Sequence, residues 1–306
     1  MAMISTNQTR RPTKLRIAAS LAGLLTVFSI QGIALAEEVT GKLPDVSRVV
    51  SIGDSITEIV YALGEEGHLI ARDQTSIYPE AARKLPDVGY MRALSPEGVL
   101  SINPTAIIAV EGSGPKETID ILKKASVPFV FVPEDYTDKS IPAKIRAVGK
   151  ALGVDDKAEK LAAQIEKDLL AAEDATRNIK TRKRVLFVLS AQGGKIMASG
   201  TKTAANGIIA LAGAENAVTE YPGYKPMTDE AIITAKPDVI LVMDRGGDHA
   251  ADNADLLANA AIAATPAGKD KKIIRMGGQY LLGFGPRAPE AIHELAVAIY
   301  GNELSQ

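Results

Sequence analysis

Two stretches of the chain repeat one another without a gap, and this repeat restricts the fold more than any other feature. Residues 94–112 read LSPEGVLSINPTAIIAVEG, and residues 227–245 read MTDEAIITAKPDVILVMDR. In each copy a residue that can cap a helix, Ser95 or Thr228, begins a short helical pattern that a proline ends. A continuous aliphatic run follows, as is typical of a buried parallel strand. The repeat therefore predicts two units of the same α/β type.

The order of elements around each copy supports two similar lobes. Aliphatic runs alternate with helical patterns, and the predicted helices end at Gly64 and Gly213. The predicted strands cover residues 48–52, 106–110, 184–189 and 239–243, and the predicted helices cover 57–63 and 203–211. Alternation of this kind favours parallel sheets with right-handed crossovers. We therefore expect an α/β fold of two Rossmann-like lobes with mostly parallel sheets.

One long α-helix is predicted between the two repeats. Apolar residues recur at three- and four-residue spacing over 155–178, and neither Gly nor Pro interrupts the segment. A helix of about 24 residues spans roughly 36 Å, which is enough to reach both lobes. The predicted domains are a signal peptide at 1–36, an N-terminal lobe at 37–154, a linking helix at 155–179 and a C-terminal lobe at 180–306. Two lobes joined by one helix leave a cleft between them, where ligands usually bind.

The first 36 residues have the pattern of an export signal. The segment before residue 17 contains four basic residues and no acidic residue, and an apolar stretch follows from 17 to 33. Ala34-Leu35-Ala36 then matches the small-x-small pattern of signal peptidase sites. The alternative is an uncleaved anchor, although the apolar stretch is short and contains serine and threonine residues. The pattern predicts a soluble periplasmic protein after cleavage, exported by the general secretory or the twin-arginine route.

Composition excludes several classes of partner and site. After residue 36 the chain has 31 Lys and Arg residues against 37 Asp and Glu residues. This acidic balance disfavours a nucleic-acid partner, which needs a basic surface. The chain has no cysteine, which excludes disulfides, thiolate metal sites, covalent c-type haem and a lipidated N-terminal cysteine.

The segment VVSIGDSITE, residues 49–58, raises the one enzymatic alternative. It resembles the first block of the GDS-type esterases, in which the serine, here Ser55, is the nucleophile. Such a serine needs a histidine base, an orienting carboxylate and oxyanion donors. Those esterases place an Asp three residues before the His, and none of the three histidines of this chain has that neighbour. The structural alternative is a strand that turns at Gly53 into a helix, capped by Ser55 or Asp54, with Glu58 completing a capping box.

The segment PDVGYMRALSPEG, residues 86–98, carries the most informative side chains. Tyr90 follows a glycine in a predicted loop, and Arg92 lies two positions further on. A tyrosine phenolate is a hard oxygen donor that suits ferric iron, and tyrosine is an established haem ligand. Iron and a nearby cation both favour the charged phenolate, and Arg92 could supply that cation or pair with a carboxylate of the ligand. The alternative is a pair of ordinary surface side chains.

Over essentially the whole chain after residue 36, the sequence resembles the periplasmic haem-binding proteins that serve haem importers of the ABC type. The motifs that carry the resemblance are GYMRALSPEG, LLGFGPR, MASGTKTAANGIIALAG and the long linking helix. The resemblance implies that Tyr90 is the axial ligand of a ferric haem and that the chain delivers haem to a permease dimer in the inner membrane. We also expect an outer-membrane haem receptor upstream and a monomeric carrier. The wider class includes ferric siderophore and cobalamin carriers, which remain alternatives.

Three further residues are predicted to face a bound haem. Arg245 ends the strand of the second repeat and is expected to bind a haem propionate or the iron-bound phenolate, and the alternative is a capping charge on the surface. Gln192 follows the first strand of the C-terminal lobe. Tyr280 follows two glycines and is expected to be a second oxygen ligand or a wall of the pocket. The positions of Arg245 and Gln192 suit the rule that ligands of open α/β sheets bind at the carboxyl ends of strands.

Glu97 and Glu230 occupy matching positions in the two repeats. Each lies near the start of a predicted short helix, where a carboxylate interacts favourably with the helix dipole. In the family that the chain resembles, one such carboxylate on each lobe docks onto basic pockets of the two permease subunits. Charge pairs of this kind set orientation and association rate more than affinity. We therefore expect Glu97 and Glu230 to dock the transporter.

Overall fold

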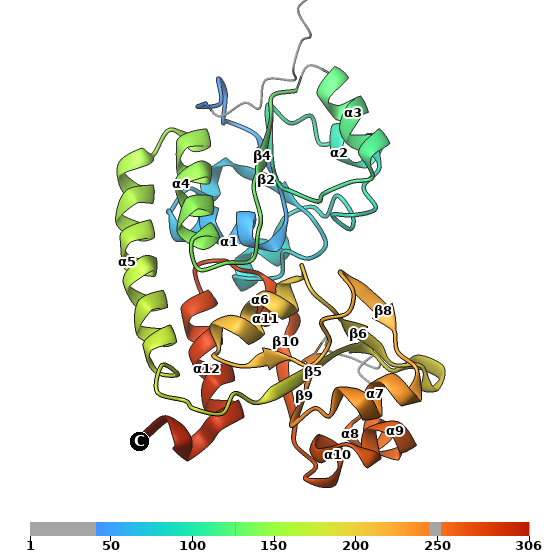
Figure 1. Cartoon of the computed structure of the whole chain (residues 1–306). Helices are drawn as coiled ribbons and strands as arrows, with labels where there is room; N and C mark the ends of the chain where they lie inside the picture. The colour runs from blue at the N-terminus through green and yellow to red at the C-terminus, as the bar shows by residue number, and fades with distance from the viewer. Residues whose placement is uncertain (1–40, 126, 245–251, 306) are drawn as a thin grey trace, which may run out of the picture. The chain divides into compact units, whose positions relative to one another are not determined.

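The computed structural model describes residues 41–125, 127–244 and 252–305. Within them the chain forms two α/β lobes, each built around its own sheet (Figure 1). The predicted signal segment lies outside the described residues. None of the helices in the described ranges combines the length and the apolar composition needed to cross a membrane.

The N-terminal lobe contains a four-stranded sheet in the order β2-β1-β3-β4, and all neighbouring strands are parallel, as predicted. Every residue of β3 is buried, which is typical of a central parallel strand. The elements of this lobe are β1 Val49–Ile52, α1 Asp54–Ala62, η1 Glu66–His68, β2 Leu69–Arg72, η2 Glu80–Lys84, α2 Pro96–Leu100, β3 Ala106–Val110, α3 Lys116–Lys124, β4 Phe129–Val132 and α4 Ser140–Leu152.

The C-terminal lobe contains a six-stranded sheet in the order β10-β9-β5-β6-β8, with β7 paired to β5. Its elements are β5 Arg184–Ser190, η3 Gln192–Gly194, β6 Met197–Ser199, α6 Ala204–Leu211, β7 Glu215–Asn216, β8 Tyr224–Pro226, α7 Asp229–Ala235, β9 Val239–Asp244, α8 Asn253–Ala258, α9 Ala260–Ala264, α10 Pro266–Lys269, β10 Ile273–Gly277, α11 Gly278–Leu282, α12 Ala288–Tyr300 and η4 Gly301–Ser305.

This second sheet is mixed, although the sequence predicts mostly parallel pairing. Strands β10, β9, β5 and β7 are parallel, whereas β6 runs antiparallel to both β5 and β8. The two antiparallel strands are only three residues long and carry no aliphatic run that would mark them in the sequence. Pro226 ends the edge strand β8, a position where a missing backbone donor is tolerated.

The sequence repeat corresponds to a repeated structure. Ser95 caps α2 by accepting a hydrogen bond from the Gly98 N–H at 2.9 Å. Thr228 caps α7 in the same way, accepting from the Ala231 N–H at 3.2 Å. A central strand follows each helix, β3 in one lobe and β9 in the other. The predicted caps and strands are therefore confirmed in both lobes.

Helix α5, Asp155–Asp174, packs against α4 of the N-terminal lobe and α12 of the C-terminal lobe (Figure 1). It ends four residues before the predicted end and spans about 30 Å at 1.5 Å per residue. Its buried stripe confirms the predicted periodicity and consists of Ala158, Ala162, Ile165, Leu169 and Ala172. A Cβ at Gly149 of α4 would lie 2.1 Å from Ala158 Cβ, so a glycine is needed for this close approach.

The largest buried apolar cluster is shared by the two lobes. It joins Ile56 of α1 and Ile145 of α4 to Ile165 of α5, and these to Ile208 of α6 and Leu295 of α12. Two smaller clusters lie within single lobes, one around β9 and one around β3. A core that continues from lobe to lobe opposes large relative movements, because separating the lobes would expose apolar surface.

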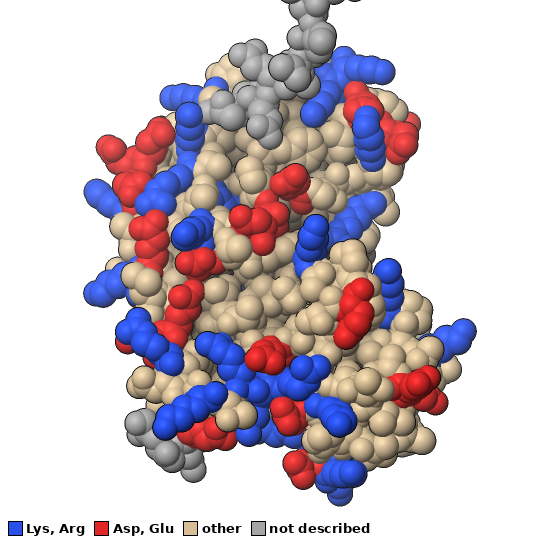
Figure 2. Space-filling model, in the orientation of Figure 1, with Lys and Arg blue, Asp and Glu red and all other residues tan. Residues whose placement is uncertain are grey.

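Charged residues of both signs are interspersed over the face of the molecule that Figure 2 displays. Lys and Arg side chains lie beside Asp and Glu side chains along α5, where Arg146 of α4 pairs with Glu159 and Glu166.

Candidate functional site

The two lobes meet where α1 faces the C-terminal segment 283–287, a contact that we call the lobe junction. Glu58 of α1 accepts three hydrogen bonds from Arg287, from the backbone N–H at 2.9 Å, from Nε at 3.1 Å and from Nη2 at 2.8 Å. The Glu58 side chain is 7% exposed. The Arg287 guanidinium also lies 3.5 Å from the centroid of the Tyr78 ring. This charge-assisted contact holds one lobe against the other.

The structure contradicts the predicted capping box. Helix α1 begins at Asp54, directly after Gly53, and no side chain caps its N-terminus. Ser55 therefore lies inside the first turn, and Glu58 bonds to Arg287 instead of reaching back to the start of the helix. Gly53 has a φ of 105°, and a Cβ there would lie 2.5 Å from Val110 Cγ1, so the turn requires a glycine.

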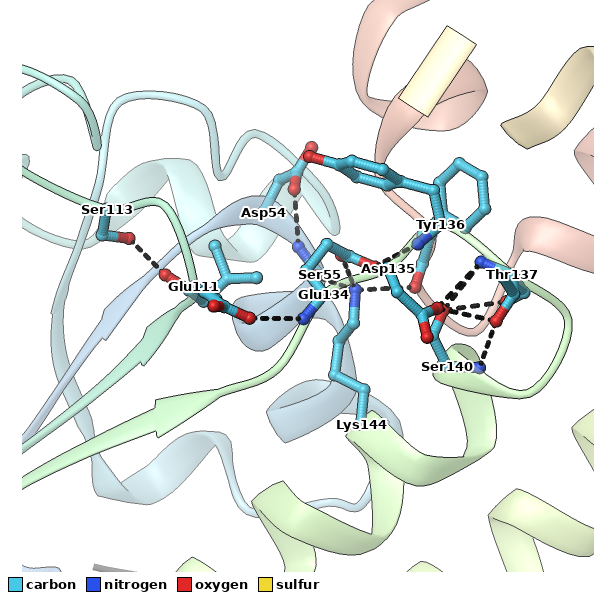
Figure 3. Close-up of polar contacts among 12 residues, drawn as sticks. Asp54, Ser55, Glu111, Ser113, Glu134, Asp135, Tyr136, Thr137, Ser140 and Lys144 are labelled. Atoms are coloured by element: carbon cyan, nitrogen blue, oxygen red, sulfur yellow. Dashed lines mark hydrogen bonds and ion pairs between the residues drawn. The ribbon is translucent and has the colours of Figure 1, made fainter. Parts of the chain in front are cut away.

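A buried lysine forms a second cross-lobe contact (Figure 3). The Lys144 ammonium of α4 donates to Glu134, to Ser55 Oγ at 3.2 Å and to the Phe284 carbonyl at 3.2 Å. Its side chain is 0% exposed, and these three bonds use all three of its donors. Because Phe284 belongs to the C-terminal lobe, Lys144 connects the GDSITE turn to the opposite lobe.

The same contacts argue against Ser55 as a nucleophile. Ser55 is 2% exposed, so its hydroxyl is closed to a substrate. The basic group beside it is Lys144, whose ammonium is paired with Glu134 and has no lone pair with which to accept a proton. The GDSITE turn thus has a structural role at the lobe junction.

Asp54 lies at the same junction and is partly buried. Its Oδ1 accepts a hydrogen bond from the Ser55 N–H at 2.8 Å. Burial raises the pKa of Asp54 to about 7, and the Asp73 carboxylate adds to this rise, whereas Lys144 opposes it. The Tyr136 hydroxyl points toward Asp54 (Figure 3). The junction therefore contains a carboxyl group that titrates near neutral pH.

Two glycines of the LLGFGPR motif allow these carboxylates to approach the opposite backbone. A Cβ at Gly283 would lie 3.3 Å from Asp54 Oδ2, and a Cβ at Gly285 would lie 3.1 Å from Glu58 Oε1. At either position a side chain would push the carboxylate aside by a few tenths of an ångström, and at Gly283 it would also clash with the Gln279 carbonyl oxygen at 2.5 Å. The GDSITE and LLGFGPR motifs, which are far apart in the sequence, therefore pack against one another.

An aromatic pair also crosses the junction. The rings of Tyr136 and Phe284 meet edge-on with their centroids 5.4 Å apart. Both residues have a left-handed backbone, with φ of 58° and 49°, which costs of order 1–3 kcal/mol each. A Cβ at Gly207 of α6 would lie 2.4 Å from the Tyr136 carbonyl oxygen, so α6 can approach this loop only with a glycine there.

Arg92 interacts electrostatically with tyrosines of both lobes. Burial raises the pKa of Tyr136 in the N-terminal lobe and of Tyr224 on β8, and the Arg92 guanidinium opposes the rise in both. Arg92 is exposed and forms no ion pair with the described residues. An unpaired cation close to two phenols forms a polar surface that suits an anionic ligand between the lobes.

Tyr90 lies on the surface of the N-terminal lobe and is 43% exposed. Gly89 before it has a φ of 101°, a backbone that glycine adopts readily. The Gly89 carbonyl accepts a hydrogen bond from the Gln74 N–H at 2.8 Å, which ties this loop to the segment after β2. The phenol is thus accessible and its loop is anchored.

The other predicted haem contacts follow strands in the sequence. Gln192 begins η3 just after β5, and its side chain lies outside the described residues. Arg245 follows the last residue of β9 and also lies outside them. Tyr280 of α11 is half-buried, with its ring centroid 5.3 Å from the Arg287 guanidinium. Burial, and secondly Glu294, raises the pKa of Tyr280, so its surroundings favour the neutral phenol.

Glu97 and Glu230 lie in the first turns of the equivalent helices α2 and α7. Both are exposed, and neither forms an ion pair with another described residue. Each lobe therefore presents one of these two carboxylates without an ion-pair partner among the described residues.

Sequence reasoning missed Lys144, Arg287 and Tyr136. Lys144 lies on the apolar stripe of α4 between Ile141 and Ile145, and a lysine in such a stripe is a detectable sign of a buried cation. Arg287 belongs to a motif that the sequence singles out, but its partner is 229 residues away. Tyr136 lies in a loop with no periodic pattern.

The chain resembles known proteins in both sequence and structure. A profile described as periplasmic binding protein matches residues 49–280. The structure resembles the periplasmic haem-binding protein RhuT from Roseiflexus sp. RS-1 in apo form, with 38% sequence identity, a TM-score of 0.79, and coverage of 85% of this chain and 99% of that chain. It also resembles the periplasmic haem-binding protein BhuT in complex with two haems, with 38% identity, a TM-score of 0.78, and coverage of 82% and 97%.

Sequence similarity also extends to carriers of another ligand. The vitamin B12-binding protein of Pectobacterium carotovorum is 27% identical over 198 residues, which are 64% of this chain and 70% of that protein.

Loss of the arginine at the junction should destabilise the whole chain. In Arg287→Met the Glu58 carboxylate stays buried without its cation, so we expect the free energy of unfolding in urea to fall by about 3–5 kcal/mol. The matched control, Arg146→Met, breaks exposed pairs with Glu159 and Glu166 and should cost less than about 1 kcal/mol. Equal losses in the two variants would contradict a special role for the junction.

The pH dependence of the unfolding free energy should reveal the titration of the Asp54 carboxyl. Its pKa is higher in the folded chain than in the unfolded chain, so folding favours the protonated carboxyl. The contribution is fully present below about pH 4 and is lost as the pH rises toward about 7. Asp54→Asn should therefore remove part of the fall in unfolding free energy over this range. Asp120→Asn, which changes an exposed aspartate on α3, should keep that fall, and an Asp54→Asn profile parallel to wild type would refute the assignment.

Proposed function

We propose that the solute of this chain is haem. The chain belongs to the periplasmic binding protein family, whose members bind solutes and are not enzymes, and it is similar to haem-binding proteins of known structure. On this proposal the chain is a haem carrier that delivers its cargo to an ABC importer. The observation that carries the proposal is an accessible tyrosine, Tyr90, on an anchored loop of a chain that is 38% identical to two periplasmic haem-binding proteins.

Tyr90 is proposed as the axial ligand of the ferric iron. A phenolate oxygen binds ferric iron well, and the positive charge of the iron favours loss of the phenolic proton. Arg92 is proposed to assist, since it is exposed, unpaired among the described residues and charged at any physiological pH. Its guanidinium could form paired hydrogen bonds with a haem propionate.

The remaining haem contacts are proposed from sequence position. Arg245 and Gln192 follow β9 and β5 in the sequence, and these two strands are parallel neighbours whose carboxyl ends share one edge of the sheet. Tyr280 is proposed as a wall of the site rather than as a second ligand, because its surroundings favour the neutral phenol. The sequence left both roles open for Tyr280, a second oxygen ligand or a wall of the pocket.

Location and partners complete the proposal. The family and the export pattern at residues 1–36 support a periplasmic carrier released by signal-peptide cleavage. Its partners would be the permease dimer of an inner-membrane importer and, upstream, an outer-membrane haem receptor. The carrier would act as a monomer and would place Glu97 and Glu230 on the two permease subunits.

A corrinoid is the second candidate for the solute. It is favoured by the 27% identity to a vitamin B12-binding protein. A corrinoid carrier would not need an iron-binding phenolate, so the response of binding to changes at Tyr90 separates the two proposals.

A hemin titration followed by visible absorption tests the cargo and the ligand together. We expect saturable one-to-one binding with charge-transfer bands of a ferric phenolate. Tyr90→Phe keeps the ring but removes the oxygen, so those bands should vanish and affinity should fall by at least about tenfold, or 1.4 kcal/mol. Tyr61→Phe, at a tyrosine of α1 outside the proposed site, should bind as wild type does.

Weak, unsaturable hemin binding by wild type and Tyr90→Phe alike would overturn the haem proposal. Titration with cyanocobalamin would then decide for or against the corrinoid candidate.

Docking can be tested separately from binding. The double variant Glu97→Lys with Glu230→Lys should keep the hemin affinity of wild type but deliver haem more slowly to the importer in proteoliposomes, because charge complementarity sets the encounter rate. A double variant with the same change in net charge, Asp156→Lys with Asp270→Lys, is the control. Equal delivery rates for the two double variants would refute a specific docking role.

A further inference from the structure

Asp54 is in close contact with the opposite lobe. It begins α1 in the N-terminal lobe, and its Oδ2 lies so near Gly283 that a Cβ on that residue would be 3.3 Å away. The adjoining cross-lobe contacts are the Glu58–Arg287 pair and the bond from Lys144 to the Phe284 carbonyl. A change in the volume or hydration of the Asp54 carboxyl therefore acts directly on the lobe junction.

The groups that face Asp54 are mostly acidic. Asp73 approaches from the loop after β2, and Glu58 lies one turn further along α1. Lys144 of α4 is the cation nearby, and Tyr136 from the loop before α4 contributes a neutral hydroxyl. A carboxylate placed beside two other carboxylates is disfavoured relative to the neutral acid.

The nearby cation is already occupied. Lys144 directs its three donors to Glu134, to Ser55 Oγ and to the Phe284 carbonyl, so none is left for Asp54. Among the described residues, Asp54 accepts one hydrogen bond, from the Ser55 N–H. An ionised carboxylate needs more acceptor bonds than this, and water is the available donor.

We propose that Asp54 is a proton-dependent latch between the lobes. In the neutral form the carboxyl packs against the Gly283 segment and the junction stays closed. In the ionised form it is repelled by Asp73 and Glu58 and draws water into the junction, which loosens the contact between the lobes. A rise in pH through neutrality would thus make the ligand surfaces of the two lobes more mobile relative to one another. The latch depends on the junction and not on the identity of the solute.

The distance between the lobes can be measured directly in the ligand-free full chain. Because the chain contains no cysteine, Ile121→Cys on α3 and Ile233→Cys on α7 would carry two spin labels and no others. Both positions are exposed, at 47% and 45%. Pulsed electron paramagnetic resonance should show a longer and broader distribution of label separations at pH 8 than at pH 6.

Neutral replacements should abolish this shift. Asp54→Asn, which mimics the protonated acid, should keep the pH 6 distribution at both pH values. Asp54→Ser is a second, smaller neutral replacement and should give the same result, so the test does not depend on one variant folding well. Asp156→Asn on α5 should shift as wild type does. The latch is overturned if the wild-type distribution is the same at both pH values, or if the neutral variants shift as wild type does. Neither result depends on hemin binding, so the proposed function stands or falls separately.

Discussion

The buried contact between Glu58 and Arg287 is the interaction on which the arrangement of the two lobes depends. A buried ion pair is favourable only when further hydrogen bonds satisfy the charges, and here the carboxylate accepts three from one arginine. Its partners are 229 residues apart, so the pair joins the beginning of one lobe to the end of the other. The glycines at 283 and 285, the buried Lys144 and the left-handed backbones of Tyr136 and Phe284 lie at the same junction.

A fixed junction has a consequence for a carrier. The shared apolar core and α5, which packs on both lobes, leave little freedom for wide opening, so the facing surfaces are largely formed before a ligand arrives. A preformed site spends less free energy on ordering when it binds. On the proposed function, Tyr90 and Arg92 would line the N-terminal side of that site, and Tyr224, with which Arg92 interacts electrostatically, would line the C-terminal side. Any regulation would then act through small changes at the junction.

The sequence predicts local structure well where local physics decides it. The strands β1, β3, β5 and β9, the caps at Ser95 and Thr228 and the buried stripe of α5 all follow from hydrophobic periodicity and capping. The antiparallel strands β6 and β8 are not predicted from the sequence, because strands of three residues carry no periodic signal. The capping box at Ser55 fails because Glu58 finds a stronger, charged partner from the other lobe. Long-range pairs of this kind cannot be derived from spacing, although the motifs that contain them are visible.

The most direct test of the account is a crystal structure of the chain with hemin bound. The account predicts one haem between the two lobes, with its iron bonded to the Tyr90 oxygen and with the Glu58–Arg287 contact unchanged. A haem bound elsewhere on the surface, or an iron bonded to another side chain while Tyr90 stays in solvent, would contradict it.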